Sequence, residues 1–264
     1  MRHLSVKKTA PAGLPRSRGY IMWEGASVLD GAPIAIIATM STSNKKTGDM
    51  VQTWIIRTDI NPVEASKVGA DASVCGNCVH RHYSKGACYV NIGQAPNAVY
   101  KGYTKGIYPA FNLERHGHHF TARKIRLGAY GDPAAVPFEA VASIALLGIG
   151  HTGYTHQASH KNFDPRFMSL CMVSADTPKQ ALKYQAQGAK TFRVAMVGDA
   201  LFDSEIECLA DAKGIQCIDC GLCDGSTKNI AITVHGSRSS NFKSNLIEAI
   251  QLWATYRLPI QLQK

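Results

Sequence analysis

The sequence predicts an α/β protein with a mainly parallel βα barrel, complete or partial. From residue 124 onward, short apolar and β-branched runs alternate with helical segments of about a dozen residues, which is the pattern of repeated βα units. Before residue 124, a polar turn joins two β-branched runs. About seven or eight strands result, which favours a βα barrel. An open doubly wound sheet is the alternative.

The N-terminal strands are predicted at residues 32–40 and 50–58, which are rich in Ile, Val and Thr. Asn, Gly and Asp in the intervening segment 41–49 suit a turn, so the two strands are expected to form a β-hairpin. Two helical segments follow, at 63–70 and 95–106, one on each side of a run of cysteines.

The second half of the chain supplies the βα units. Strands are predicted at 124–131, 151–156, 167–175, 190–198 and 229–236, and helices at 137–148, 177–188 and 239–257. Thr177 is the expected N-cap of the middle helix, with Pro178 at its first position. The last helix is amphipathic and closes the chain.

We expect a single α/β domain over residues 1–264, because no Pro/Ser-rich linker or internal repeat interrupts the chain. Within it, 1–70 holds the first strands, 71–128 the first cysteines and a basic, aromatic stretch, and 129–264 the βα units. No apolar run approaches the roughly 20 residues that span a bilayer. The N-terminus has no signal-peptide core, so we expect a cytoplasmic protein, in the host cell if a phage encodes it.

Seven of the eight cysteines fall into two compact groups. The first cysteine group is Cys75, Cys78 and Cys88, spaced C-x2-C-x9-C. The second cysteine group is Cys208, Cys217, Cys220 and Cys223, spaced C-x8-C-x2-C-x2-C. Thiolates at such short spacing can reach one metal centre from a single turn, which predicts two metal sites. Disulfides are the alternative, disfavoured in a reducing compartment.

The second group favours a [4Fe–4S] cluster, because three of its thiolates are separated by two residues, as in ferredoxin-type runs. Zinc is the alternative. The first group offers only three thiolates, which would leave one iron of a cube open to a small molecule. If the first group holds zinc instead, His80 or His82 could supply the fourth ligand.

Positive charge is concentrated around and just after the first cysteine group. Residues 71–128 carry eight basic and two acidic side chains in a chain of net charge +10. The basic residues that alternate with aromatic ones are Lys101, Lys105, Arg115, Arg123, Lys124 and Arg126. Basic and aromatic residues together suit phosphate neutralisation and base stacking, so a nucleic-acid partner is one interpretation. A solvated basic face whose aromatic rings pack inward is the other.

Polar residues follow several predicted strands. Asp132 follows the strand at 124–131, His156 ends the next one, and Asp176 and His235 follow or end two later ones. In a βα barrel these side chains would converge at the mouth, which makes Asp132, His156 and His235 candidate catalytic residues. Each of them could instead be a cap or a hydrogen-bonded structural residue. A hydrolase site made of His116, His118, His119 and Asp132 is a weaker hypothesis, because these residues form no compact ligand motif.

The order of these features resembles the layout of radical S-adenosylmethionine enzymes that carry an auxiliary cluster. Three cysteines come early, Gly131-Asp132-Pro133 closes a following strand, and four cysteines come late. The usual motif of that family is C-x3-C-x2-C, from which this chain departs. The resemblance implies that the first group binds a cluster with S-adenosylmethionine.

Further roles follow from the same resemblance. Gly131, Asp132 and Asp176 would bind the cofactor, with Asp132 at its amino group. His156 and His235 would orient the substrate or transfer protons. The second cysteine group would relay electrons or bind substrate.

Several segments also resemble phage and mobile-element proteins of the "gene product 88" type, namely residues 88–109, 126–139, 152–157, 191–194 and 220–225. This resemblance implies a phage or plasmid origin. The sequence therefore predicts a phage- or plasmid-type iron–sulfur protein that acts as a radical S-adenosylmethionine-like enzyme, with nucleic acid as one candidate substrate. The alternative is a non-enzymatic, metal-stabilised protein that binds nucleic acid or a host factor.

Overall fold

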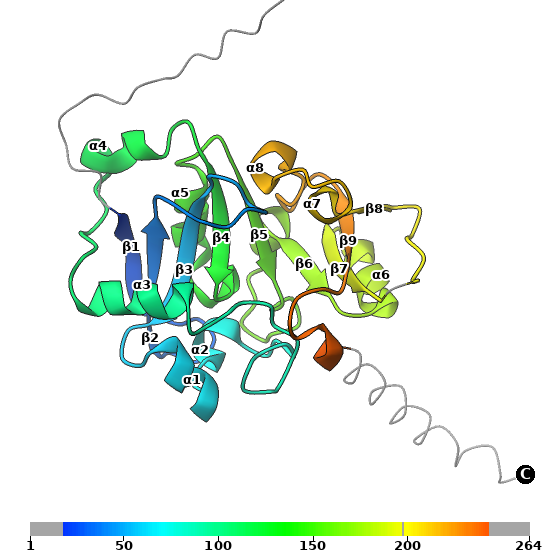
Figure 1. The fold of residues 1–264 in the computed structure, drawn as a ribbon, viewed down its shortest axis with the longest axis horizontal. Helices are drawn as coiled ribbons and strands as arrows, with labels where there is room; N and C mark the ends of the chain where they lie inside the picture. The colour runs from blue at the N-terminus through cyan, green and yellow to red at the C-terminus, as the bar shows by residue number, and fades with distance from the viewer. Residues whose placement is uncertain (1–17, 197, 243–264) are drawn as a thin grey trace, which may run out of the picture.

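A computed structural model describes residues 18–196 and 198–242 of the chain. Within them nine strands form one sheet in the order β1-β2-β3-β4-β5-β6-β7-β9-β8 (Figure 1). The strands are β1 (Gly19–Ala26), β2 (Pro33–Thr39), β3 (Val51–Arg57), β4 (Lys124–Tyr130), β5 (Gly150–Thr155), β6 (Met172–Ala175), β7 (Thr191–Ala195), β8 (Glu205–Glu207) and β9 (Asn229–Thr233).

The first three strands are antiparallel, and the predicted hairpin is confirmed as β2 and β3. Ile37 pairs with Trp54 in its register, and buried apolar side chains line both strands. Strand β1, which the sequence analysis did not predict, adds to the free edge of β2.

From β3 onward every strand pairing is parallel. The parallel strands follow chain order as far as β7, as they would in a βα barrel, and β9 then lies between β7 and β8. In the described part of the chain, β1 and β8 are the two outer strands of this order. The α/β class and the mainly parallel sheet are thus confirmed, whereas a closed barrel is not.

Short helices connect the strands. They are α1 (Pro62–Val68), α2 (Ala72–Cys75), α3 (Ala95–Thr104), α4 (Leu113–His116), α5 (Phe138–Ala145), α6 (Pro178–Ala186), α7 (Leu209–Ala212) and α8 (Cys217–Cys220), with 3-10 turns η1 (Gly117–His119), η2 (Pro133–Ala135) and η3 (Pro165–Ser169). The predicted cap of α6 is confirmed: the Thr177 side chain accepts a hydrogen bond from the Gln180 backbone N–H, and Pro178 occupies the first turn.

The strand predicted at 167–175 is wrong in its first half. Residues 165–169 form the 3-10 turn η3, and only Met172–Ala175 is strand. The Asp164 side chain caps the turn by accepting from the Arg166 backbone N–H, and Pro165 fixes the first backbone angle in the helical range. Local capping therefore outweighs the apolar character of this run.

The main core lies where the helices pack on β1 to β4, and Ile37, Ile56, Phe120 and Ile125 are completely buried there. Helices α1 and α2 lie at one end of the strands, while α7 and α8 lie toward the other (Figure 1). Of the helix predicted at 239–257, nearly all falls outside the described residues. Among the helices that are described, none combines the length and apolarity needed to cross a bilayer.

Candidate metal centre

The first cysteine group follows β3, the first strand of the parallel series, and is tied to the carboxyl ends of β4 and β5. Helix α2 ends at Cys75, whose carbonyl accepts a hydrogen bond of 2.9 Å from Gln157 Nε2 just after β5. The carbonyl of Val74 accepts one of 2.6 Å from the Asp132 backbone N–H just after β4. The loop that carries the cysteines is therefore held at the edge of the sheet where the parallel strands end and the loops begin.

Glycine at position 76 makes this attachment possible. Gly76 has φ +54° and ends α2 between the first two cysteines of the group. A Cβ at this position would lie 1.9 Å from Gln157 Oε1, which also accepts a bond of 3.3 Å from the Asn77 backbone N–H. Only glycine combines that backbone angle with so close an approach.

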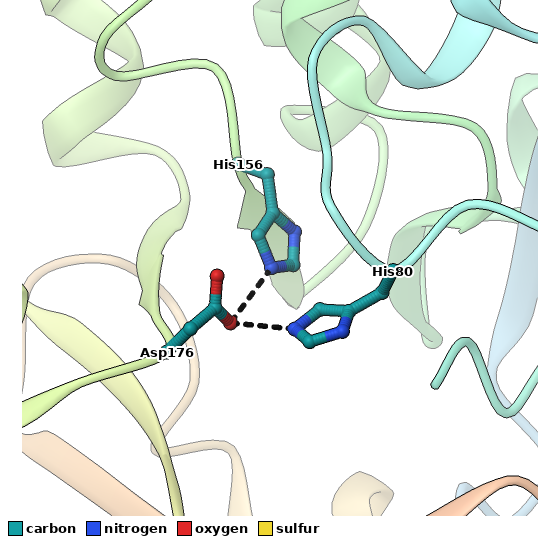
Figure 2. Close-up of side chains that lie close together, drawn as sticks. All are labelled: His80, His156 and Asp176. Atoms are coloured by element: carbon teal, nitrogen blue, oxygen red, sulfur yellow. Dashed lines mark hydrogen bonds and ion pairs between the residues drawn. The ribbon is translucent and has the colours of Figure 1, made fainter. Parts of the chain in front are cut away.

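Two histidines and an aspartate converge at the same edge (Figure 2). His80 comes from the cysteine loop, His156 from the end of β5 and Asp176 from the end of β6. Asp176 Oδ1 lies 2.6 Å from His80 Nε2 and 3.6 Å from His156 Nε2. One ligand atom from each of the three residues lies within 4.8 Å of the other two. We call these three residues the His-Asp-His group.

The electrostatics of the group favour an ionised aspartate. Burial alone would raise the pKa of Asp176, but the neighbouring His156 and His80 outweigh burial and lower it. Burial would lower the pKa of His156, but the neighbouring Cys78 and Asp176 raise it well above its ordinary value. The three side chains are 12%, 26% and 17% exposed for His80, His156 and Asp176, so the group is partly shielded from water.

The thiols of the first cysteine group lie beside this group. Cys78 interacts directly with the His156 side chain. Burial, and then the nearby Cys78 and Cys88, raise the pKa of the Cys75 thiol well above its ordinary value. Burial likewise raises the pKa of Cys88. A metal that binds Cys75 and Cys88 would therefore displace protons from partly buried thiols whose pKa is raised.

The second cysteine group assembles on a face of the sheet. Its four cysteines line one cavity together with Thr152 and Tyr154 of β5. The Gly153 backbone N–H donates to the Cys223 carbonyl at 3.0 Å, and the Cys217 backbone N–H donates to the Lys46 carbonyl at 2.9 Å. The turn between β2 and β3 thus supports α8, which carries two of the cysteines.

All eight cysteines are free thiols. Burial raises the pKa of Cys223 to about 12, although a hydrogen bond with Tyr154 acts in the opposite direction. In the described chain, no three cysteine sulfurs lie within 4.8 Å of one another. Four thiolates on one zinc ion would lie about 3.8 Å apart, so neither cysteine group has the spacing of a formed zinc site.

Asp132 lies beside the first cysteine group but has a structural role. Its Oδ2 accepts a bond of 2.7 Å from the His156 backbone N–H and one of 3.3 Å from Gln157 Nε2, and its Oδ1 accepts from the Ala134 backbone N–H. Both carboxylate oxygens are therefore engaged in holding loops. The preceding Gly131 has φ +79°, and a Cβ there would lie 2.7 Å from Ile55.

The other predicted histidines lie apart from the His-Asp-His group. His235 is exposed, stacks on Tyr89 and bonds to Lys46 Nζ at 3.2 Å. His82 Nε2 bonds to the Val90 carbonyl at 2.9 Å. The set proposed for a hydrolase, His116, His118 and His119, lies in α4 and η1, where two of its members stack on Tyr20.

The basic residues of the basic, aromatic stretch differ in exposure. Lys101, Lys105 and Arg115 are exposed, Lys124 is half-buried, and Arg123 binds the Met40 carbonyl and Asp49. Arg126 is buried, and its Nη2 donates to the Tyr89 hydroxyl at 2.7 Å. The aromatic residues of the stretch pack against the core, namely Tyr100, Tyr103, Tyr108, Phe111 and Phe120. This arrangement matches the interpretation in which the rings pack inward.

Sequence reasoning placed His156 and Asp176 at one edge of the sheet and named His80 or His82 as a fourth zinc ligand, but it did not predict that His80, His156 and Asp176 meet. Residues 80, 156 and 176 are far apart in the chain. The signal that could have joined them is that His156 and Asp176 end neighbouring strands. Gln157, which anchors Cys75, was also missed.

Comparison of the chain with protein-family models, with curated proteins and with solved structures gave no match in any of the three. The chain is therefore classified by its own fold and site. It is an α/β protein with a mainly parallel sheet whose carboxyl edge gathers three cysteines and a His-Asp-His group.

Proposed function

We propose that the protein is an iron–sulfur enzyme similar to the radical S-adenosylmethionine enzymes. The observation that carries the proposal is the order of features along the parallel strands. Three cysteines follow the first of these strands, β3, and Gly131-Asp132-Pro133 follows the second, β4. Hydrogen bonds from Asp132 and Gln157 bring the two segments together at the carboxyl edge.

The sequence spacing of the second cysteine group also favours a cluster over a zinc ion, because three of its thiolates are separated by two residues. Each cysteine of a [4Fe–4S] cube binds a different iron corner, so the sulfurs lie farther apart than they do around one zinc ion. The first group supplies three ligands and leaves one iron free, while the second supplies four.

When bound, a [4Fe–4S] cluster with S-adenosylmethionine supplies one-electron cleavage of the cofactor's C–S bond and hydrogen abstraction from a substrate. Cys75, Cys78 and Cys88 would hold the cluster at the sheet edge. Asp132, whose carboxylate is engaged in loop bonds, would position His156 rather than bind the cofactor through a free oxygen. Cys208, Cys217, Cys220 and Cys223 would hold the auxiliary cluster.

The test is metal and sulfide analysis of the full-length protein purified without oxygen, together with electron paramagnetic resonance. Two cubes would give about eight irons and about eight sulfides per chain. Cys88→Ser should remove about half of the iron, and Cys220→Ser the other half. Cys171→Ala is the matched control, because Cys171 is fully buried and belongs to neither group.

Two outcomes would overturn the proposal. The first is a colourless protein that holds zinc and no acid-labile sulfide. The second is a cluster-loaded protein that leaves S-adenosylmethionine intact when dithionite is supplied as the reductant. In the first case the cysteine groups would be structural zinc sites. The exposed residues Lys101, Lys105 and Arg115 would then be the ones to test for nucleic-acid binding, by the salt dependence of affinity.

A further inference from the structure

We infer that the His-Asp-His group binds one divalent transition-metal ion, separate from any cluster on the cysteines. This inference goes beyond the proposed function and does not depend on it. Its ligands would be His80 Nε2, His156 Nε2 and a carboxylate oxygen of Asp176 (Figure 2).

Asp176 Oδ1 makes two different contacts in the group: His80 Nε2 is within hydrogen-bond distance at 2.6 Å, whereas His156 Nε2 is not. His156 Nε2 is buried and makes no hydrogen bond, yet it faces Asp176 Oδ1 at 3.6 Å. That separation is too long for a hydrogen bond. Two donors bound at about 2.1 Å to one ion lie about 3.0 Å apart at a right angle and about 3.4 Å apart at the tetrahedral angle. The observed 2.6 and 3.6 Å lie on either side of these values.

The unpartnered nitrogen is the second observation that points to a ligand. A buried polar atom without a partner carries an energetic cost, and an ion that is missing from the coordinates is one of its physical explanations. The nitrogen points toward the carboxylate, as Figure 2 shows. The Asp176 carboxylate therefore lies between two histidine nitrogens, at 2.6 and 3.6 Å from its Oδ1.

The surroundings hold these ligands in place. The Asp132 carboxylate accepts the backbone N–H of His156, and the Asp176 backbone N–H donates to Gln180 Oε1 at 2.8 Å. Cys78 interacts with the His156 side chain and can fix its tautomer. The Phe242 ring packs against His80 with a centroid distance of 5.5 Å and closes one side with an apolar wall. Ligands fixed by outer contacts in this way are typical of metal sites.

The ligand set indicates the class of ion. Two imidazoles and one carboxylate with further positions open are the set used for non-haem Fe²⁺, and they also suit Zn²⁺ in a catalytic site. Hard ions such as Mg²⁺ and Ca²⁺ prefer all-oxygen ligands, so they are not expected. The open positions would face solvent at the carboxyl edge of the sheet.

The test uses Co²⁺ as a probe, titrated into the full-length protein under anaerobic, reducing conditions. We expect d–d absorption bands from a nitrogen- and oxygen-ligated Co²⁺ ion that lack intense thiolate-to-metal charge transfer. His156→Ala and Asp176→Asn should each weaken this binding by more than the roughly 10–100-fold that loss of an outer-shell partner costs. His118→Ala, at an exposed position in η1, is the control and should bind as wild type does.

Asp176→Asn should remove the carboxylate ligand without unfolding the protein, because its amide oxygen can still accept a hydrogen bond from His80. Unchanged near-ultraviolet circular dichroism would show that this variant is folded. Two results would overturn the inference: Co²⁺ binding that is the same in wild type and both variants, or binding only with thiolate charge transfer that Cys78→Ser abolishes. Acid-labile sulfide content reports on the proposed clusters separately, so either idea can fail alone.

Discussion

Asp132 Oδ2 accepts a hydrogen bond of 2.7 Å from the backbone N–H of His156. Through this bond, a carboxylate at the end of β4 sets the position of an imidazole at the end of β5. Asp132 is only 8% exposed, so the contact is formed away from water. The residue that the family resemblance would use to bind a cofactor is, in this fold, a support for its neighbour.

Removal of that support should destabilise the protein. Asp132→Ala leaves the buried backbone N–H groups of His156 and Ala134 without their acceptor, at a cost of about 1–3 kcal/mol in the free energy of unfolding. Asp132→Asn keeps one carbonyl oxygen and should lose less. Urea denaturation monitored by circular dichroism measures both variants. Equal stability of Asp132→Ala and wild type would contradict the role given to this bond.

Gly76→Ala should damage the first cysteine group selectively. The added Cβ would meet Gln157, and φ at this position is positive, so the cysteine loop must move away from β5. Metal bound by the first group should fall while metal bound by the second stays. Gly188→Ala is the matched control, because Gly188 also has positive φ but no atom lies within 4 Å of its would-be Cβ. Its cost is backbone strain alone, about 1–2 kcal/mol. Metal content per chain, measured on folded protein, compares the two.

Stability should fall at alkaline pH because of Tyr103. Burial, and then its hydrogen bond to Glu24, raise the pKa of Tyr103 to about 12. The unfolded chain releases this proton near its ordinary value of about 10. The stability that the protonated Tyr103 hydroxyl contributes is therefore complete below pH 10 and is lost as the pH rises from 10 toward 12. Tyr103→Phe should show a weaker decline than wild type over that range in thermal melts, and parallel curves would argue against this coupling.

Loading the second cysteine group with metal should stabilise the fold. A metal that binds only the native state adds RT ln(1 + [L]/Kd), about 2.7 kcal/mol at a hundredfold excess over Kd. The cavity joins α7 and α8 to β5, so chelation should lower the melting temperature and expose this region first. Hydrogen exchange with and without a strong chelator measures the effect. Protection of residues 208–223 that does not change on chelation would mean that these thiols hold no metal.

Local sequence signals were enough for most elements of the fold. Runs of apolar and β-branched residues predicted β2, β3, β4, β7 and β9, and the Thr177-Pro178 pair predicted the start of α6. Strand β8 was missed because it has only three residues and gains its stability by pairing with β9. Residues 165–169 were misassigned because an aspartate cap and a proline favour a 3-10 turn over a strand.

Sequence alone revealed the candidate ligands: two groups of thiols at short spacing, and polar residues where strands end. Those features are local, so spacing and strand periodicity reveal them. The fold was needed to show that Asp132 holds a loop, that Arg126 is buried, and that His80 contacts Asp176. These contacts join residues from 24 to 96 positions apart, or depend on which face of the sheet a side chain occupies. Strand pairing and loop docking fix such contacts, and no short stretch of sequence encodes them.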